Sequence, residues 1–400
     1  MHGFGFNTLA LLAAVGFAGP LLASVPRLRI PVIIGELVAG LVLGKTGFGV
    51  VDVANPTFQL LANIGFALVM FVVGTHVPIR DRKMRSAVPL ALARAVLIGA
   101  VAAALGAGLA AEFGTGHAAL YAVLMASSSA ALALPVIDSL GVQGPQVLSV
   151  TAQIAIADAA SIVLLPLVID VRRAPTAALG ALAIAGCAAV LFVLLRAVDR
   201  RGWRKRLHAY SEKHEFALEL RISLLVLLAL AALAVSTHVS IMLAGFALGL
   251  VIGAVGEPRR LARQLFGITE GFFGPLFFVW LGASLQVREL GSHPKLIVLG
   301  VGLGLGAVLA HCVGRLLGQP LTLAALAAAQ LGVPVAAATI GTEEHLLVTG
   351  EASAMMLGAL LTIAAASIAG ALAARGQPAA TAAKPADPDK SAQRGGQPQA

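Results

Sequence analysis

The sequence predicts an all-α protein that crosses a lipid bilayer many times. Hydrophobic residues make up 58% of the 400-residue chain and charged residues only 12%, whereas soluble proteins average about 25% charged residues. A soluble fold of this length could not enclose so much apolar surface in its core. The same hydrophobicity excludes disorder for most of the chain.

Apolar stretches long enough to cross a bilayer as a helix, which takes about 20 residues, recur along the chain. We predict thirteen of them, at 7–24, 30–48, 57–77, 86–111, 118–138, 147–170, 176–197, 218–236, 239–255, 265–286, 295–317, 321–341 and 352–374. The first stretch lacks the charged start of a secretory signal, so we expect it to be retained as a helix.

The Lys and Arg residues predict the orientation of these helices, because basic loops stay on the cytoplasmic side. With the N-terminus outside, the inside loops hold Arg27, Arg29, Arg80, Arg82, Lys83, Arg85, the basic 200–213 stretch, Arg259, Arg260 and Arg263. The outside loops hold fewer, and among them only Arg172 and Arg173 run against the rule. We therefore expect a bacterial inner-membrane protein with its C-terminus in the cytoplasm. The net charge of +9 then faces anionic lipid headgroups rather than nucleic acid.

Several other classes of function lack their sequence signals. Cys187 and Cys312 form neither a disulfide framework nor a paired metal-ligand spacing. No GxGxxG or Walker motif occurs in a βαβ context, which argues against a nucleotide-driven pump. We expect no cofactor, and no metal beyond a transported monovalent cation. Residues 376–400 are rich in Pro, Ala and Gln and are expected to be disordered.

Asp158 is the most informative ionisable residue, because it lies near the middle of the 147–170 helix. No Lys or Arg lies within one helical turn of it. A carboxylate at that depth is costly and usually functional, and it can hold either a proton or a cation, which is the minimum that an antiporter needs. The alternative is a structural aspartate hydrogen-bonded between helices.

Two of the predicted helices contain residues that interrupt a helix. Three serines and a proline do so in the first, and a glutamine, a glycine and a proline in the second: Ser127, Ser128, Ser129 and Pro135, then Gln330, Gly332 and Pro334. Such breaks free backbone carbonyls and supply hydroxyl oxygens. Broken helices at corresponding places in two halves indicate inverted repeats with a binding site at the midplane. We expect two three-helix bundles, 86–170 and 295–374, that cross at their breaks.

Other ionisable residues at membrane depth allow more than one interpretation. His311 could be a packed core histidine, a cation that balances Asp158, or a titrating gate. Arg315 could join it in that role or extend towards the cytoplasmic surface. Glu36 could line an entrance or fix helix packing. Glu270 and Arg94 lie near cytoplasmic ends and are weaker candidates.

The chain resembles the cation:proton antiporter superfamily, especially the branch with Kef-type potassium efflux systems and bacterial sodium/proton antiporters. The resemblance covers almost all of 1–374 and rests on the order and spacing of several stretches: 30–49 (IPVIIGELVAGLVLGKTGFG), 60–77, 127–135 (SSSAALALP), 152–165 (AQIAIADAASIVLL), 236–253 and 271–285.

This resemblance implies a sodium/proton antiporter-like fold with a mobile core and a scaffold that forms a homodimer. Asp158 falls on the family's essential aspartate, with Ser127–Ser129 at the broken helix beside it. Electrogenic members have a second acid just before this aspartate, and here Ala157 takes that place, which favours electroneutral exchange. His311 stands where a basic residue is common and so becomes a plausible partner of Asp158. We expect no regulatory nucleotide-binding domain of the Kef type.

The resulting division of the chain has six parts. It comprises scaffold and dimerisation helices in 1–85, a core bundle in 86–171, a linker helix with a basic cytoplasmic loop in 172–216, further scaffold helices in 217–290, a second core bundle in 291–375, and the tail 376–400.

The predicted function is proton exchange for Na⁺ or K⁺ by alternating access. Three alternatives remain open: a transporter of a small organic anion on the same fold, a membrane-embedded serine hydrolase, and a degenerate transporter acting as a sensor. The hydrolase is disfavoured because the chain has no Gly-x-Ser-x-Gly nucleophile elbow.

Overall fold

The structure is a computed structural model in which the described residues form helices and no strands. It describes residues 4–24, 32–76, 82–139, 144–170, 172–202, 210–211, 214, 216–237, 239–256, 259–285, 288 and 294–375. The predicted disordered tail 376–400 and most of the basic 203–215 segment lie outside these residues.

The helices of the first half are α1 (Phe6–Gly16), α2 (Ala18–Ala23), α3 (Val32–Leu43), α4 (Pro56–His76), α5 (Arg82–Phe113), α6 (Ala118–Ala126), α7 (Ala130–Ser139), α8 (Pro145–Ile169) and α9 (Ala174–Arg200). Those of the second half are α11 (Leu218–Ser236), α12 (Ile241–Val255), α13 (Arg259–Ile268), the π-helix η1 (Thr269–Phe273), α14 (Gly274–Ser284), α15 (Pro294–Cys312), the 3₁₀-helix η3 (Val313–Leu317), α16 (Leu321–Ala327), α17 (Gly332–Glu343) and α18 (Glu351–Arg375).

The apolar helices of the described chain correspond one to one with the thirteen predicted stretches. Ten segments are long and apolar enough to cross a membrane, and three more, Val32–Leu43, Ala118–Leu134 and Ile241–Val255, are apolar but shorter. Several predicted stretches are built from two helices, because the chain bends or breaks within them, as α16 and α17 do in 321–342. The prediction of an all-α, multi-pass membrane protein is therefore confirmed.

One group of helices packs by close backbone contact at glycines. α4 lies along α12 and α3 lies along α14. A side chain at Gly40 would collide with the Val279 backbone of α14, and one at Gly282 would collide with the Leu37 backbone of α3. Glycine is required at both positions because neither obstacle is a flexible side-chain end, and the two helices could not approach so closely otherwise.

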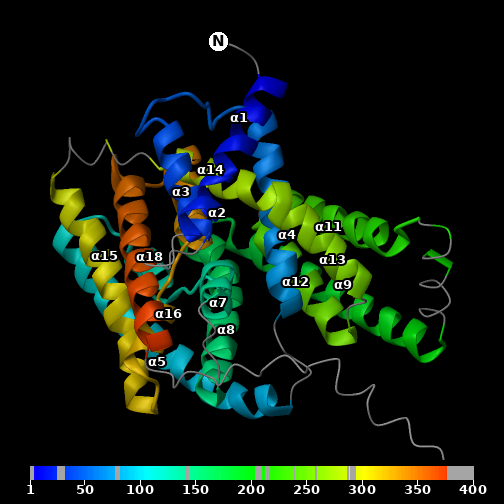
Figure 1. Ribbon diagram of the computed structural model, residues 1–400. Coiled ribbons are helices and arrows are strands. Elements are labelled where there is room, and N and C mark those ends of the chain that lie inside the picture. Colours follow the sequence, from blue (N-terminus) through cyan, green and yellow to red (C-terminus); the bar gives the residue numbers. More distant parts are fainter. Residues whose placement is uncertain are drawn as a thin grey trace, which may run out of the picture.

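A second group of helices surrounds the interrupted ones. α5 packs on α6 and α8, and α15 packs on α18 and α5. In Figure 1 the α5, α15 and α18 helices stand on the left, α9, α11, α12 and α13 on the right, and α7 and α8 between them. The predicted division into a moving core and a fixed scaffold concerns motion and stays a prediction.

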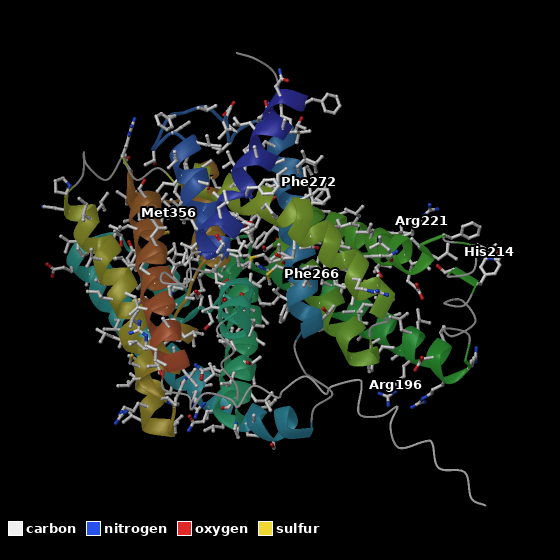
Figure 2. All side chains as sticks on the ribbon, viewed as in Figure 1. Arg196, His214, Arg221, Phe266, Phe272 and Met356 are labelled. Carbon is white, nitrogen blue, oxygen red and sulfur yellow. The ribbon has the colours of Figure 1, made fainter. Side chains whose placement is uncertain are left out.

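The outer surface is apolar, as a bilayer requires. Phe266 and Phe272 are 60% and 37% exposed and lie on the outside of the helix group at the right (Figure 2). Arg196 near the end of α9, His214 and Arg221 at the start of α11 are spread along the right-hand side of the molecule (Figure 2). This end of the molecule flanks the basic segment that the sequence predicts to be cytoplasmic.

Candidate functional site

The two interrupted spans touch each other at their breaks. The first is broken between α6 and α7 at Ser127–Ser129, and the second between α16 and α17 at 328–331. The Ser129 backbone N–H donates to the Ala329 carbonyl at 2.7 Å, and the Ser128 hydroxyl donates to the Ala327 carbonyl at 2.7 Å. The predicted crossing of two broken helices is thus present.

Only some of the residues expected to break these helices lie in the breaks themselves. The serines themselves separate α6 from α7, whereas Pro135 lies inside α7. In the second span Gln330 lies in the break, Gly332 begins α17, and Pro334 follows in its first turn. The Gln330 backbone N–H donates to the Thr362 hydroxyl of α18 at 3.1 Å, which fixes the break against that helix.

Asp158 lies against the first break. Its Oδ2 accepts a hydrogen bond from the Ala130 N–H at 3.0 Å, and the residue is 1% exposed. Ala130 is the first residue of α7, so the carboxylate faces the partial positive charge of a helix N-terminus. The ion pairs found in the described chain join His117 to Glu351 and Arg173 to Asp170 and Glu344. Within that part of the chain, Asp158 has no basic residue to neutralise it.

The hydroxyls of Ser127 and Ser128 are buried and donate to carbonyl oxygens near helix ends. Ser127 donates to the Leu124 carbonyl at 2.7 Å, and Ser128 donates to Ala327, the last residue of α16. Carbonyls at a helix C-terminus carry partial negative charge and favour a cation. The crossing therefore combines a carboxylate, hydroxyl oxygens and carbonyl oxygens, the ligand types that suit a hard monovalent cation.

His311 reaches the same break from α15. Its Nδ1 is 2.9 Å from the Ala307 carbonyl and its Nε2 is 3.3 Å from the Ser128 hydroxyl oxygen. Nδ1 must donate to a carbonyl, which leaves Nε2 of a neutral ring as an acceptor. Ser128 has one proton, and Ala327 already accepts it, so all three contacts hold together only when the ring is protonated.

The remaining predicted charges lie apart from this cluster. Arg315 is exposed in η3, and Glu36 is buried in α3 beside α2. Neither has a hydrogen bond or ion pair to Asp158 or the serines in the described chain. The structure thus brings together Asp158, the three serines and His311, but not Arg315 or Glu36.

Sequence reasoning gave little weight to a buried polar group at the predicted cytoplasmic side of the core. Arg94 is 4% exposed and donates to the Ser149 hydroxyl and to the Leu317 carbonyl, each at 2.8 Å. Gln153 lies one turn beyond Ser149 on α8, is fully buried, and has no hydrogen-bond partner for either amide atom. The sequence makes Arg94 a weak candidate, because it lies near a helix end. The sequence signal for this polar group is Gln153, a glutamine inside an apolar helix.

Another buried carboxylate, that of Glu351, lies at the opposite end of the core. Glu351 Oε1 accepts from the Tyr121 hydroxyl at 2.6 Å and lies 2.7 Å from His117 Nδ1. Its Oε2 accepts from the Val348 N–H at 2.9 Å. From the sequence alone Glu351 is assigned to an acidic loop with Glu343 and Glu344. It is in fact the first residue of α18. It joins α18 to α6 and is fully satisfied, which marks it as structural.

A cavity of about 440 Å³ separates the two groups of helices. It is lined by α4, α8, the start of α9, the end of α11, the start of α12, α14 and α17, with Asn63 and Trp280 among the lining residues. It reaches Gly332, the first residue after the second break. The cavity therefore leads from the surface towards the crossing of the broken helices.

The sequence and the fold match a known family of transporters. The family model of the transmembrane part of sodium/hydrogen exchangers matches residues 11–380. The chain belongs to this family. Solved structures of the sodium proton antiporter MjNhaP1 from Methanocaldococcus jannaschii superpose with TM-scores of 0.62 and 0.66. They cover 92% of this chain and 98% and 96% of the other, at 17% identity, which shows a shared fold.

Curated relatives of this exchanger-family chain are longer than it is. It is 24% identical over 376 residues to the putative Na⁺/H⁺ antiporter YjbQ of Bacillus subtilis, covering 88% of this chain and 61% of that protein. It is 28% identical over 337 residues to the Na⁺/H⁺ antiporter NhaS5 of Synechocystis, covering 79% and 46%. The chain thus spans about half to three-fifths of their length. The family consists of transporters, so the serine hydrolase alternative is not supported.

Proposed function

We propose that this exchanger-family protein moves protons in one direction and a monovalent cation, Na⁺ or K⁺, in the other by alternating access. One observation carries the proposal: Asp158 is buried at the crossing of two broken helices, with an α-helix N-terminus but no basic side chain of the described chain against it. The relatives named above are described as Na⁺/H⁺ antiporters, which supports protons and a monovalent cation as the transported ions.

In this proposal the Asp158 carboxyl holds either a proton or the cation, and never both. Hydroxyls of Ser127–Ser129 and carbonyl oxygens such as that of Ala327 complete the cation's shell. Both loaded forms neutralise the carboxylate, whereas the empty carboxylate is charged and costly to carry through an apolar barrier. That difference couples the two flows and limits leak.

Exchange is electroneutral in this proposal, because Ala157 leaves a single carboxylate at the site. One negative charge binds one proton or one monovalent cation, so each half of the cycle carries the same net charge. The transport rate in liposomes should then be independent of an imposed membrane potential.

The test is flux through purified protein in proteoliposomes with an imposed pH gradient, using Na⁺, K⁺ and small organic anions separately. We expect cation-driven proton flux that disappears in Asp158→Ala. Ser223→Ala, a buried serine on α11 away from the crossing, is the matched control and should retain the flux. Undiminished exchange in Asp158→Ala would overturn the site, and flux with organic anions alone would overturn the cargo.

A further inference from the structure

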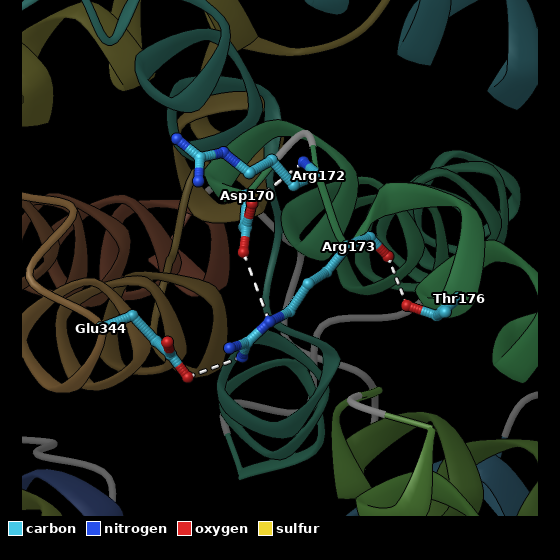
Figure 3. Close-up of polar contacts among 5 residues, drawn as sticks. All are labelled: Asp170, Arg172, Arg173, Thr176 and Glu344. Carbon is cyan, nitrogen blue, oxygen red and sulfur yellow. Dashed lines mark hydrogen bonds and ion pairs between the residues drawn. The ribbon is translucent and has the colours of Figure 1, made fainter.

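The charged residues that line the cavity form one group at its mouth. They are Asp170 after the end of α8, Arg173 before the start of α9, and Glu344 after the end of α17. Asp170 Oδ2 lies 3.5 Å from Arg173 Nε, and Glu344 Oε1 accepts from Arg173 Nη1 at 2.6 Å. Figure 3 shows the guanidinium of Arg173 between the two carboxylates.

This group remains in contact with water. The side chains of Arg173 and Glu344 are 45% and 40% exposed, and that of Asp170 is 20% exposed. Exposed ion pairs contribute little to folding stability. Glu344 raises the pKa of Arg173 further, so this charge stays fixed while the pH changes. With both carboxylates ionised, the group carries a formal charge of −1, made of two carboxylates and one guanidinium.

In the proposed function, a cation that enters through this cavity passes this group on its way to the crossing. The cavity has Glu344 and Arg173 at its exposed end and Gly332, next to the second break, at its inner end. Negative charge at the mouth of a low-dielectric cavity raises the local concentration of cations. The guanidinium of Arg173 lies on both carboxylates and so opposes that attraction.

We propose that Arg173, with Asp170 and Glu344, sets the apparent affinity for the transported cation on the side of the membrane where this cavity opens. Arg173 acts through the electrostatic field of the mouth and does not coordinate the cation at Asp158. This inference rests on the proposed cation cargo. The sequence predicts that side to be external.

The neighbouring residue supplies a matched control. Arg172 carries the same charge, is exposed, and does not line the cavity. Its backbone N–H donates to Asp170 Oδ1 at 2.9 Å, but its guanidinium takes no part in the contacts that Arg173 makes (Figure 3).

The experiment measures the KM for Na⁺ and for K⁺ at each face separately, using right-side-out and inside-out vesicles that contain the full chain. At low ionic strength Arg173→Gln should lower the KM about two-fold at the face where the cavity opens. This is the effect expected in water when a unit positive charge about 10 Å from the entering cation is removed. Glu344→Gln should raise it. Arg172→Gln should change it less than Arg173→Gln does. The exchanged pair Arg173→Glu with Glu344→Arg should restore it.

Salt separates this electrostatic role from a structural one. In high N-methylglucamine chloride the differences should shrink, because the Debye length falls to about 3 Å near 1 M. An unchanged KM, an equal change at both faces, or a change that persists in high salt would each overturn the inference. If the wild-type protein shows no cation-driven flux at either face, the proposed cargo fails instead, and the two failures are distinguishable.

Discussion

Ser128 has one hydroxyl proton and two neighbours that can accept it, the Ala327 carbonyl and a neutral His311 ring. Protonation of His311 removes this competition, because Nε2 then donates to the serine oxygen. The proton also places a positive charge beside the break that Asp158 faces. We therefore expect His311 to oppose cation binding when it is protonated.

This role predicts a change in pH dependence for His311→Gln. Acid should inhibit the wild-type protein twice, through competition of protons for Asp158 and through charge on His311, whereas the variant keeps only the first effect. The acid limb of its rate profile should be shallower. The measurement is the initial rate of cation-driven proton flux against pH, with His117→Gln, which changes a histidine of the Glu351 cluster, as control. Superimposable profiles for wild type and His311→Gln would contradict it.

Pairs of helices in the group formed by α3, α4, α12 and α14 meet through glycine, and this contact can be tested without touching the site. In Gly282→Ala the new methyl group would meet the Leu37 carbonyl carbon at 2.9 Å and the Leu41 nitrogen at 3.0 Å. Backbone atoms cannot rotate aside, so α3 and α14 must separate. Overpacking of this kind typically costs about 1–3 kcal/mol.

Thermal unfolding in detergent should therefore show a lower melting temperature for Gly282→Ala. Gly99→Ala, in α5, is the matched control, because nothing lies within 4 Å of the added methyl group there. That change should be neutral or slightly stabilising, since alanine has a higher helix propensity than glycine. Equal melting temperatures for the two variants would mean that the α3–α14 contact is looser than the structure describes.

At the level of helices, the sequence allowed the existence and order of every apolar span to be predicted, because each needs only length and composition. The breaks at Ser127–Ser129 and near Gly332 were also visible, since residues that interrupt a helix stand out in an apolar run. The contact between Glu351 and Tyr121 was not predictable. It joins residues 230 positions apart, and their pairing depends on how α18 packs near α6.

The same limit explains the uneven outcome for the site. Asp158 was recognisable because its cost at membrane depth is a local property of one helix. The charges that lie near Asp158 come from other helices, and their positions depend on how those helices pack. The sequence therefore predicts Arg315 and Glu36 as partners alongside His311, although the structure keeps both apart from the crossing. In the sequence Arg173 is only a basic residue on the side where few are expected. The structure shows that it pairs with Glu344 at the mouth of the cavity.

For the whole molecule, the distribution of basic residues predicts which end faces the cytoplasm. α9 is 27 residues long, about 40 Å at 1.5 Å per residue, which exceeds the hydrocarbon thickness of about 30 Å. Exposed residues at its two ends, Arg172 just before it and Arg201 just after it, should therefore lie on opposite sides of the membrane.

The orientation follows from labelling these ends in cells. In a background with Cys187 and Cys312 replaced by serine, Arg172→Cys should react with an impermeant maleimide added to intact cells, and Arg201→Cys only after the membrane is opened. The reverse pattern would turn the cavity towards the cytoplasm. The effect of Arg173 on the KM would then be expected at the inner face, so the same labelling also decides on which side the mouth of the cavity meets its cation.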